Sequence, residues 1–328
     1  MRHLRLIDAL LFLMSLIWGT NYVIVKRAFE EIDPQAFNAI RMVVASTVFV
    51  AAMVVIRMRP SEPPADGSFA SVLYTPSRMA KGDVIALAGL GVVGQCLYQL
   101  WFVGGLARTS VANAALMLAA TPVLIALISA ALGEERVMWT HWVGALLSLA
   151  GIYTVVGSGV DIGGTTWVGD LMMLGAVCCW AIYTIGSRPL MTRHSPLAVT
   201  GISMAIGTAL YLAATFPHLR AVAWDRVAAG TWLAIVYSAL FALCLSYTIW
   251  YAAVREIGSA RTSVYSNLVP VVAMVTAALF LHEPMGVRKI LGAAAVLVGV
   301  ALTRVASAFR RKSDPDPDPG NRIPAKIR

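Results

Sequence analysis

Apolar residues occur along this chain in long runs that short polar segments separate. A helix needs about 20 mostly apolar residues to cross about 30 Å of hydrocarbon. Ten stretches satisfy this requirement: 6–26, 36–56, 83–106, 110–132, 139–159, 168–188, 197–216, 230–253, 259–281 and 287–308. The runs are too long, and lack the strict alternation, for the strands of a membrane β-barrel. The pattern therefore predicts an all-α integral membrane protein with ten transmembrane helices.

Two polar segments fall outside this pattern. Residues 57–82 contain several prolines, and residues 309–328 are charged and rich in proline. Such segments bury too little apolar surface to fold, so we interpret the first as a cytoplasmic loop and the second as a disordered cytoplasmic tail. The run at 6–26 is too long for a signal peptide and ends in two basic residues without a cleavage site. We therefore count it as a membrane span.

The composition supports this interpretation. Of the 328 residues, 59% are hydrophobic and 13% are charged, whereas soluble domains carry about 25% charged residues. A water-soluble enzyme and a disordered chain are both excluded. The 26 Lys and Arg residues exceed the 17 Asp and Glu residues, for a net charge of +9, which in a soluble protein would suggest nucleic-acid binding. Here the basic residues flank the apolar runs, so we expect no nucleic-acid partner.

The basic residues also predict the orientation. With the N-terminus in the cytoplasm, fifteen basic residues near the spans face that side and seven face the other. Short cytoplasmic loops of membrane proteins carry an excess of Lys and Arg. An even number of spans requires both termini on one side. We therefore expect a multi-pass protein of the inner membrane with cytoplasmic N- and C-termini.

The two halves of the chain resemble each other. A shift of 162 residues aligns Trp18 with Trp180, and a shift of 148 aligns Glu135 with Glu283. Further landmarks follow in the same order: Asp8 with Asp170, Pro34 with Pro196, Ala112 with Ala260, Pro122 with Pro270, Gly144 with Gly292, Leu149 with Leu297 and Gly151 with Gly299. We predict one repeat over 1–159, including loop 57–82, and a second over 160–308.

Five spans in each repeat make the second copy enter the membrane from the opposite side. Inverted repeats are typical of secondary transporters, which place one substrate site near the bilayer midplane and expose it alternately to each side. A channel or an intramembrane enzyme has no comparable need for inversion. The predicted architecture, two inverted five-helix repeats, therefore indicates transport.

Several short motifs resemble a known family. They are residues 16–22 (LIWGTNY), Arg41, residues 121–123 (TPV), residues 133–136 (GEER) and Gly144, with echoes at residues 269–271 (VPV), Glu283 and Gly292. As an ordered and doubled set over residues 6–308, they resemble the EamA type of the drug/metabolite transporter superfamily. The resemblance implies a ten-helix exporter of small metabolites in the inner membrane, often of amino acids. Glu134 stands where glycine is usual, and Trp180 lacks the Gly-Thr-Asn that follows Trp18.

Aromatic and amide side chains make up the predicted substrate site. Residues four apart in a helix share a face, and the 148-residue shift relates the third span to the eighth. Unpaired amides in hydrocarbon cost several kcal/mol, so they face either a cavity or another helix. The predicted substrate-binding residues are Trp18, Asn21, Tyr22, Arg41, Gln95, Tyr98, Gln99, Trp180, Tyr183, Tyr247 and Trp250. We interpret Trp101 and Tyr251 as interfacial aromatic residues outside the site.

Arg41 and two prolines have distinct predicted roles. Arg41 lies about 8 Å into the second span by the helical rise, where it either extends to the surface or binds a substrate carboxylate. Pro122 and Pro270 fall in the middle of the fourth and ninth spans and leave the carbonyls of Leu118 and Ser266 without helical partners. We predict that the two prolines are hinges.

No carboxylate is expected at mid-membrane. A permanent cation there ordinarily requires a buried acid, so a dedicated exporter of quaternary ammonium compounds and an intramembrane aspartyl protease are both disfavoured. The GLGVVG run at 89–94 lies within a span and lacks the context of a dinucleotide site. The four cysteines also fall within spans. We therefore expect neither a cofactor nor a metal.

The sequence thus predicts an exporter of small metabolites, with amino acids or related amphipathic and aromatic compounds as substrates, that works by alternating access. A small-molecule substrate and the lipid bilayer are its expected partners, and protons are a candidate coupling ion. One chain holds both repeats, so a monomer is sufficient. The alternative is a nucleotide-sugar, nucleobase or vitamin transporter of the same fold. A membrane enzyme is disfavoured because the chain offers no nucleophile, metal-ligand set or acid pair.

Overall fold

The described part of the chain is helical. The computed structural model describes residues 2–57, 79–121, 123–125, 128, 139–156, 166–191, 193–257, 262, 265–266 and 268–313. In chain order the elements are α1 (Arg2–Ala28), α2 (Pro34–Arg57), α3 (Lys81–Leu90), η2 (Gly91–Leu97), α4 (Tyr98–Arg108), α5 (Val111–Ala119), α7 (Trp139–Val156), α8 (Thr166–Met191), α9 (Pro196–Ala221), η4 (Trp224–Arg226), α10 (Ala229–Tyr237), η5 (Ser238–Leu245), α11 (Ser246–Ile257), α13 (Leu268–Phe280) and α14 (Val287–Ser313).

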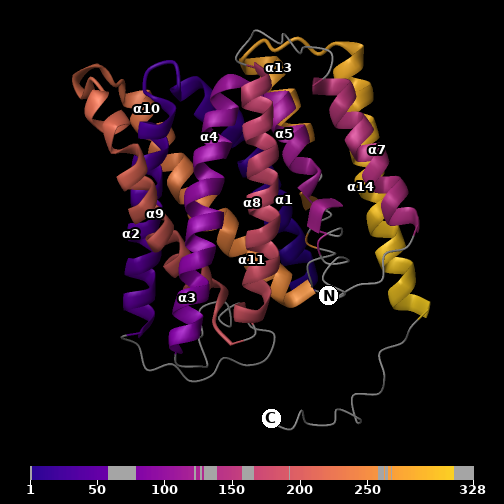
Figure 1. The fold of residues 1–328 in the computed structure, drawn as a ribbon, viewed down its shortest axis with the longest axis horizontal. Coiled ribbons are helices and arrows are strands. Elements are labelled where there is room, and N and C mark those ends of the chain that lie inside the picture. Colours follow the sequence, from indigo (N-terminus) through magenta and orange to yellow (C-terminus); the bar gives the residue numbers. More distant parts are fainter. Residues whose placement is uncertain are drawn as a thin grey trace.

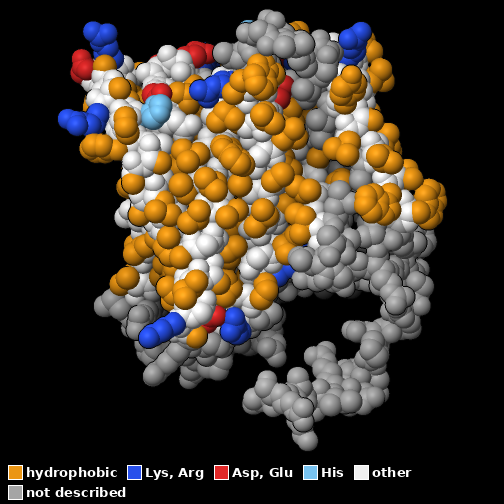
Figure 2. Space-filling view, in the orientation of Figure 1, with side chains coloured by type: hydrophobic (Ala, Val, Ile, Leu, Met, Phe, Trp, Pro, Cys, Tyr) orange, Lys and Arg blue, Asp and Glu red, His pale blue; other side chains and the backbone are white. Residues whose placement is uncertain are grey.

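The helices form an upright bundle (Figure 1). Among the described residues, six helical stretches are long and apolar enough to cross a membrane, and three shorter apolar helices accompany them. The remaining predicted span lies in α14. Figure 2 shows hydrophobic side chains covering the middle of the visible face, with charged side chains gathered towards its two ends. This all-α membrane architecture confirms the predicted fold class.

The described chain begins and ends at the same end of the bundle, because α1 starts and α14 finishes there (Figure 1). An even number of membrane crossings requires this arrangement. Residues 58–78 of the predicted loop and 314–328 of the predicted tail lie outside the described residues. The tail prediction is wrong at its start, because α14 continues to Ser313.

Contacts between helices come in pairs that the repeat relates. Helix α2 packs on its repeat counterpart α9, and α7 packs on its counterpart α14. The packing of α4 on α8 is matched by that of α11 on α1, and the packing of η2 on α9 by that of η5 on α2. The two halves therefore interlock along their length, and helices from both surround the centre.

Two π-helical segments, η2 and η5, interrupt spans that the sequence pattern predicts as plain helices. The 148-residue shift between the repeats carries Gly91–Leu97 onto residues 239–245, almost the whole of η5. A π-helix bonds residues five apart and leaves a carbonyl without its usual partner, and such segments are frequent at functional sites. In η5 the Phe241 carbonyl accepts from the backbone N–H of Ser246, five residues further on, and also from the Ser246 hydroxyl at 2.8 Å.

The structure places one of the two predicted hinge prolines, and its position in the helix differs from the prediction. Pro122 lies outside the described residues. Pro270 is the third residue of α13 rather than a mid-helix residue, and a first-turn proline sacrifices no helical hydrogen bond because its N–H would be unpaired anyway. The two carbonyls also have partners: the Thr121 hydroxyl donates to that of Leu118 at 2.6 Å, and the Val269 N–H donates to that of Ser266 at 3.3 Å.

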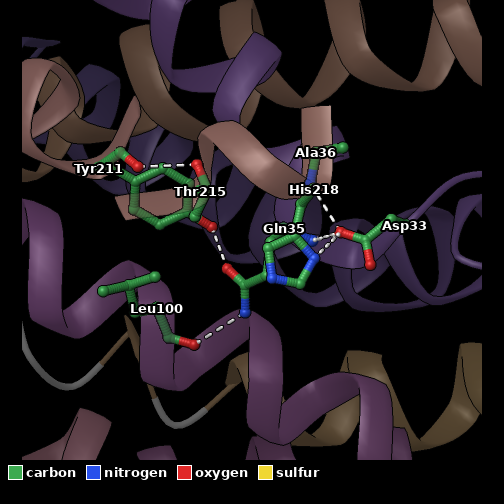
Figure 3. A network of polar contacts seen from close by, with 7 residues as sticks. All are labelled: Asp33, Gln35, Ala36, Leu100, Tyr211, Thr215 and His218. Carbon is green, nitrogen blue, oxygen red and sulfur yellow. Dashed lines mark hydrogen bonds and ion pairs between the residues drawn. The ribbon is translucent and has the colours of Figure 1, made fainter. Parts of the chain in front are cut away.

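A polar network fixes the start of α2 against α9 and α4 (Figure 3). Asp33 caps α2 by accepting from the N–H groups of Gln35 and Ala36, at 2.9 and 3.0 Å, and lies 3.1 Å from His218 of α9. The buried hydroxyl of Tyr211 donates to the Gln35 side chain, whose amide donates to the Leu100 carbonyl at 3.3 Å. This network anchors α2 two turns before Arg41.

A second polar cluster joins the repeats where α4 passes into α5. The Lys26 ammonium donates to three backbone carbonyls there, including that of Thr109 at 2.8 Å. The Thr109 hydroxyl donates to Asp170 of α8 at 2.5 Å, and Glu283 accepts from the N–H of Val111 at 2.7 Å. Residues from both repeats therefore hold this end of the bundle together.

Gly207 of α9 allows η2 to pack closely against that helix. A Cβ at this position would lie 2.6 Å from the Gly91 carbonyl and would also collide with the Gln95 side chain. Overpacking of this kind destabilises by about 1–3 kcal/mol. We therefore expect Gly207→Ala to lower the melting temperature of the purified protein in detergent. Gly230→Ala is the matched control, because its Cβ meets no atom within 4 Å. Equal melting temperatures for the two variants would contradict the close packing.

Candidate functional site

Aromatic rings from both repeats meet between α1, α4, α8 and α11. The ring of Trp18 lies 5.7 Å from that of Trp250 and 6.1 Å from that of Tyr247. Trp180 lies 5.1 Å from Tyr98 and 5.5 Å from Tyr247. Separations of 4.5–7 Å are those at which aromatic pairs attract. These five residues form one continuous aromatic cluster, to which each repeat contributes.

Local geometry explains why these rings converge. Trp18 and Tyr22 are one helical turn apart on α1, and Tyr22 lies 5.6 Å from Phe102, which stacks on Tyr98 at 5.7 Å. The indole N–H of Trp18 donates to the Ala242 carbonyl of η5 at 2.9 Å. The π-helical segment of the second repeat thus provides the acceptor that orients a tryptophan of the first. Trp18, Tyr98 and Trp180 are partly exposed, whereas Tyr22 is buried.

The cluster extends along α8 and α11. Tyr183 lies 5.8 Å from Trp180, and Tyr251 lies 6.5 Å from Tyr183 and 6.4 Å from Tyr247. Tyr251 is 3% exposed, so its interpretation as an interfacial residue is wrong. Its position four residues after Tyr247, on the same face of α11, is the signal in the sequence that identifies it. Trp101 is 39% exposed and packs against Gly175, away from these rings.

Arg41 is buried beside the aromatic cluster. Its side chain is 2% exposed, and its guanidinium donates to the Ser238 hydroxyl at 3.0 Å and to the Gln99 side-chain carbonyl at 2.8 Å. The alternative that Arg41 extends to the membrane surface is therefore wrong, and both of its bonded partners are neutral.

Several buried polar atoms around the cluster have no hydrogen-bond partner in the described part of the chain. They are Oδ1 of Asn21, Nε of Arg41, both side-chain polar atoms of Gln95 and Nε1 of Trp250. An unpaired buried polar atom costs about 1–3 kcal/mol, so a ligand that bonds to these atoms gains correspondingly. Gln95 packs against Gly207 of α9.

Comparison with known proteins gives several relatives over most of the chain. An uncharacterized transporter of Bacillus subtilis, YyaM, is 28% identical over 225 residues, covering 66% of this chain and 72% of that one. An uncharacterized transporter of Archaeoglobus fulgidus is 23% identical over 86% of this chain and 93% of its own. A probable terminal-alkyne amino-acid exporter of Streptantibioticus cattleyicolor is 27% identical over 72% of this chain and 78% of its own.

A solved crystal structure and a family model extend this similarity to almost the whole chain. The crystal structure matches with a TM-score of 0.63, covers 94% of this chain and 98% of the other, and shares 20% sequence identity, which shows a common fold. The model of the EamA-like transporter family matches twice, over residues 5–157 and 167–305. The chain therefore belongs to the EamA-like transporter family, whose members are membrane transporters and not enzymes.

Proposed function

We propose that this transporter exports amino acids or related amphipathic and aromatic metabolites by alternating access. The observation that supports this proposal most strongly is the convergence of aromatic residues from both repeats beside the buried Arg41. A relative over 72% of the chain is named as a probable amino-acid exporter, which favours the same substrate class here. The protein would act in the inner membrane with both termini in the cytoplasm.

Different side chains bind different parts of the substrate. In this proposal Arg41 binds the substrate carboxylate, in exchange for one of its contacts with Gln99 and Ser238. Trp18 and Trp180, one from each repeat, hold an apolar or aromatic side chain between them. The amides of Asn21 and Gln95 offer further hydrogen bonds. Since the two repeats are inverted, a rocking motion of one against the other would expose this central site to each side in turn.

Efflux from proteoliposomes tests this proposal. Vesicles are loaded with a mixed pool of amino acids, nucleobases and vitamins, with and without a pH gradient, and the loss of each compound is measured by mass spectrometry. We expect selective loss of a few amino acids, and a dependence on the gradient would identify protons as the coupling ion. Loss of a nucleobase or vitamin with retention of every amino acid would favour the alternative substrates instead.

Substitutions of the proposed site residues test whether efflux depends on this site. We expect Arg41→Gln to reduce efflux at least about tenfold, because loss of a hydrogen bond to a charged group costs about 1.5–3 kcal/mol. Trp18→Ala should abolish efflux while folded protein remains in the membrane. The matched controls are Arg220→Gln on the exposed end of α9 and Trp139→Ala, which is 72% exposed. Wild-type efflux from either site variant would remove that residue from the site.

The orientation is tested by fusing reporters to the C-terminus. Green fluorescent protein fluoresces on the cytoplasmic side, and alkaline phosphatase is active on the outer side. Because the basic residues predict cytoplasmic termini, we expect a fluorescent fusion with the first reporter and an inactive fusion with the second. An active phosphatase fusion without fluorescence of the other fusion would contradict the predicted orientation.

The hinge role of the prolines is retained as a proposal, at the start of α13 for Pro270 and at residue 122 in the first repeat. A proline in the first turn of a helix permits a change in the angle between α13 and the preceding residues without loss of a helical hydrogen bond. We expect Pro122→Ala and Pro270→Ala each to slow efflux, with Pro217→Ala near the end of α9 as the control. Wild-type efflux rates in both hinge variants would exclude the role.

A further inference from the structure

The buried charge of Arg41 has no opposite charge beside it among the described residues. Its two hydrogen-bond partners are a hydroxyl and an amide, both of which are neutral. A buried cation is ordinarily paired with an acid, because desolvation of a charge is expensive. Within the described part of the chain, the side chains of this site therefore carry a net charge of +1.

The described acids that bond to other helices or to helix ends do so with partners other than Arg41. Asp33 precedes Arg41 by eight residues, about 12 Å along the helix at 1.5 Å per residue, and is occupied with the cap of α2 and with His218. Asp83 pairs with Arg193 and His194. Asp170 accepts from Thr109, and Glu283 accepts from the N–H groups at the start of α5. Asp8 accepts from the Tyr265 hydroxyl, and Glu31 accepts from the Ala228 N–H and the Thr231 hydroxyl.

A ligand ammonium group finds weaker partners in this site than a ligand carboxylate does. The described acceptors are neutral. They are the side-chain oxygens of Asn21 and Gln95, the Gln99 carbonyl and the Ser238 hydroxyl that accept from Arg41, and the aromatic faces of Trp18, Trp180 and Tyr247. Cation–π contacts partly replace hydration, but the α-ammonium of an amino acid lies next to the carboxylate that binds Arg41. It is then held close to a second positive charge, between apolar walls that screen the repulsion poorly.

We infer that the site selects its substrate by net charge: amphipathic carboxylates that carry no ammonium group bind more tightly than the corresponding zwitterions, and amines without a carboxylate are rejected. This inference rests on the proposed function, since it concerns the same site, and it names organic monoanions as the preferred class. An anion leaves the loaded site neutral, whereas a zwitterion leaves it with the original charge of +1.

Three indole compounds test this selection because they differ only in their charged groups. Indole-3-propionate is tryptophan without the amino group, and tryptamine is tryptophan without the carboxylate. Binding to the purified full-length protein is measured by calorimetry and by the shift in melting temperature. We expect indole-3-propionate to bind at least about tenfold more tightly than tryptophan, which corresponds to about 1.4 kcal/mol. Tryptamine should not bind at the same concentrations.

Variants at Arg41 assign the selection to this residue. Arg41→Gln should lose the preference for indole-3-propionate, whereas Arg41→Lys, which keeps the charge, should retain the order of the three compounds with weaker affinity. Arg220→Gln should match the wild type. If Arg41→Gln does not fold, the comparison between Arg41→Lys and the wild type still tests the order.

The outcomes separate this inference from the proposed function. Tryptophan binding as tightly as indole-3-propionate, or binding of tryptamine, would overturn the charge selection while export of amino acids in the efflux assay leaves the proposed function intact. Absence of binding by all three compounds would overturn the charge selection as well. Absence of any amino-acid or related efflux from the mixed pool would instead refute the proposed function.

Discussion

The centre of the structure depends on how a buried guanidinium is stabilised inside the membrane. A charge removed from water is stable only with well-placed partners, and Arg41 has two that lie on different repeats: Gln99 in α4 and Ser238 at the start of η5. Helices α2 and α4 and the segment η5 must therefore keep their relative positions for the guanidinium to remain hydrogen-bonded. The aromatic cluster adjoins this point, so the same register brings its rings together.

The π-helical segments explain how the backbone reaches these partners. Ser238 is the first residue of η5, and Ala242, the acceptor for Trp18, lies four residues further along the same segment. A π-helix changes the direction of the side chains that follow it, and here it precedes Tyr247 in one repeat and Tyr98 in the other. The segments η2 and η5 occupy equivalent positions in the two repeats. Each repeat therefore has one such change of side-chain direction, and both lie beside the centre.

Much of the fold is predictable from the sequence because lipid imposes a simple rule on composition and length. The apolar runs give the spans, and the paired landmarks such as Trp18 and Trp180 give the repeats. The same pairing selects most of the rings that meet in the structure. Aromatic residues four positions apart share a face in any α-helix. Their spacing alone therefore predicts this part of the candidate site.

Other features depend on contacts that spacing does not encode. The partner of Arg41, Ser238, is 197 residues away, so depth along the helix leaves open whether the guanidinium reaches the surface. Hydrophobicity is the same in α- and π-helical segments, so η2 and η5 leave no mark in the apolar pattern. Pro270 looks central in its apolar run, yet α13 begins only two residues before it.

In the proposed function, one site that both repeats build around Arg41 holds the exported substrate. An experimental structure of the transporter with an exported compound bound tests this directly. We expect a ligand carboxylate within hydrogen-bonding distance of the Arg41 guanidinium and the remainder of the ligand between Trp18 and Trp180. A ligand bound elsewhere, with Arg41 still bonded to Gln99 and Ser238, would contradict it.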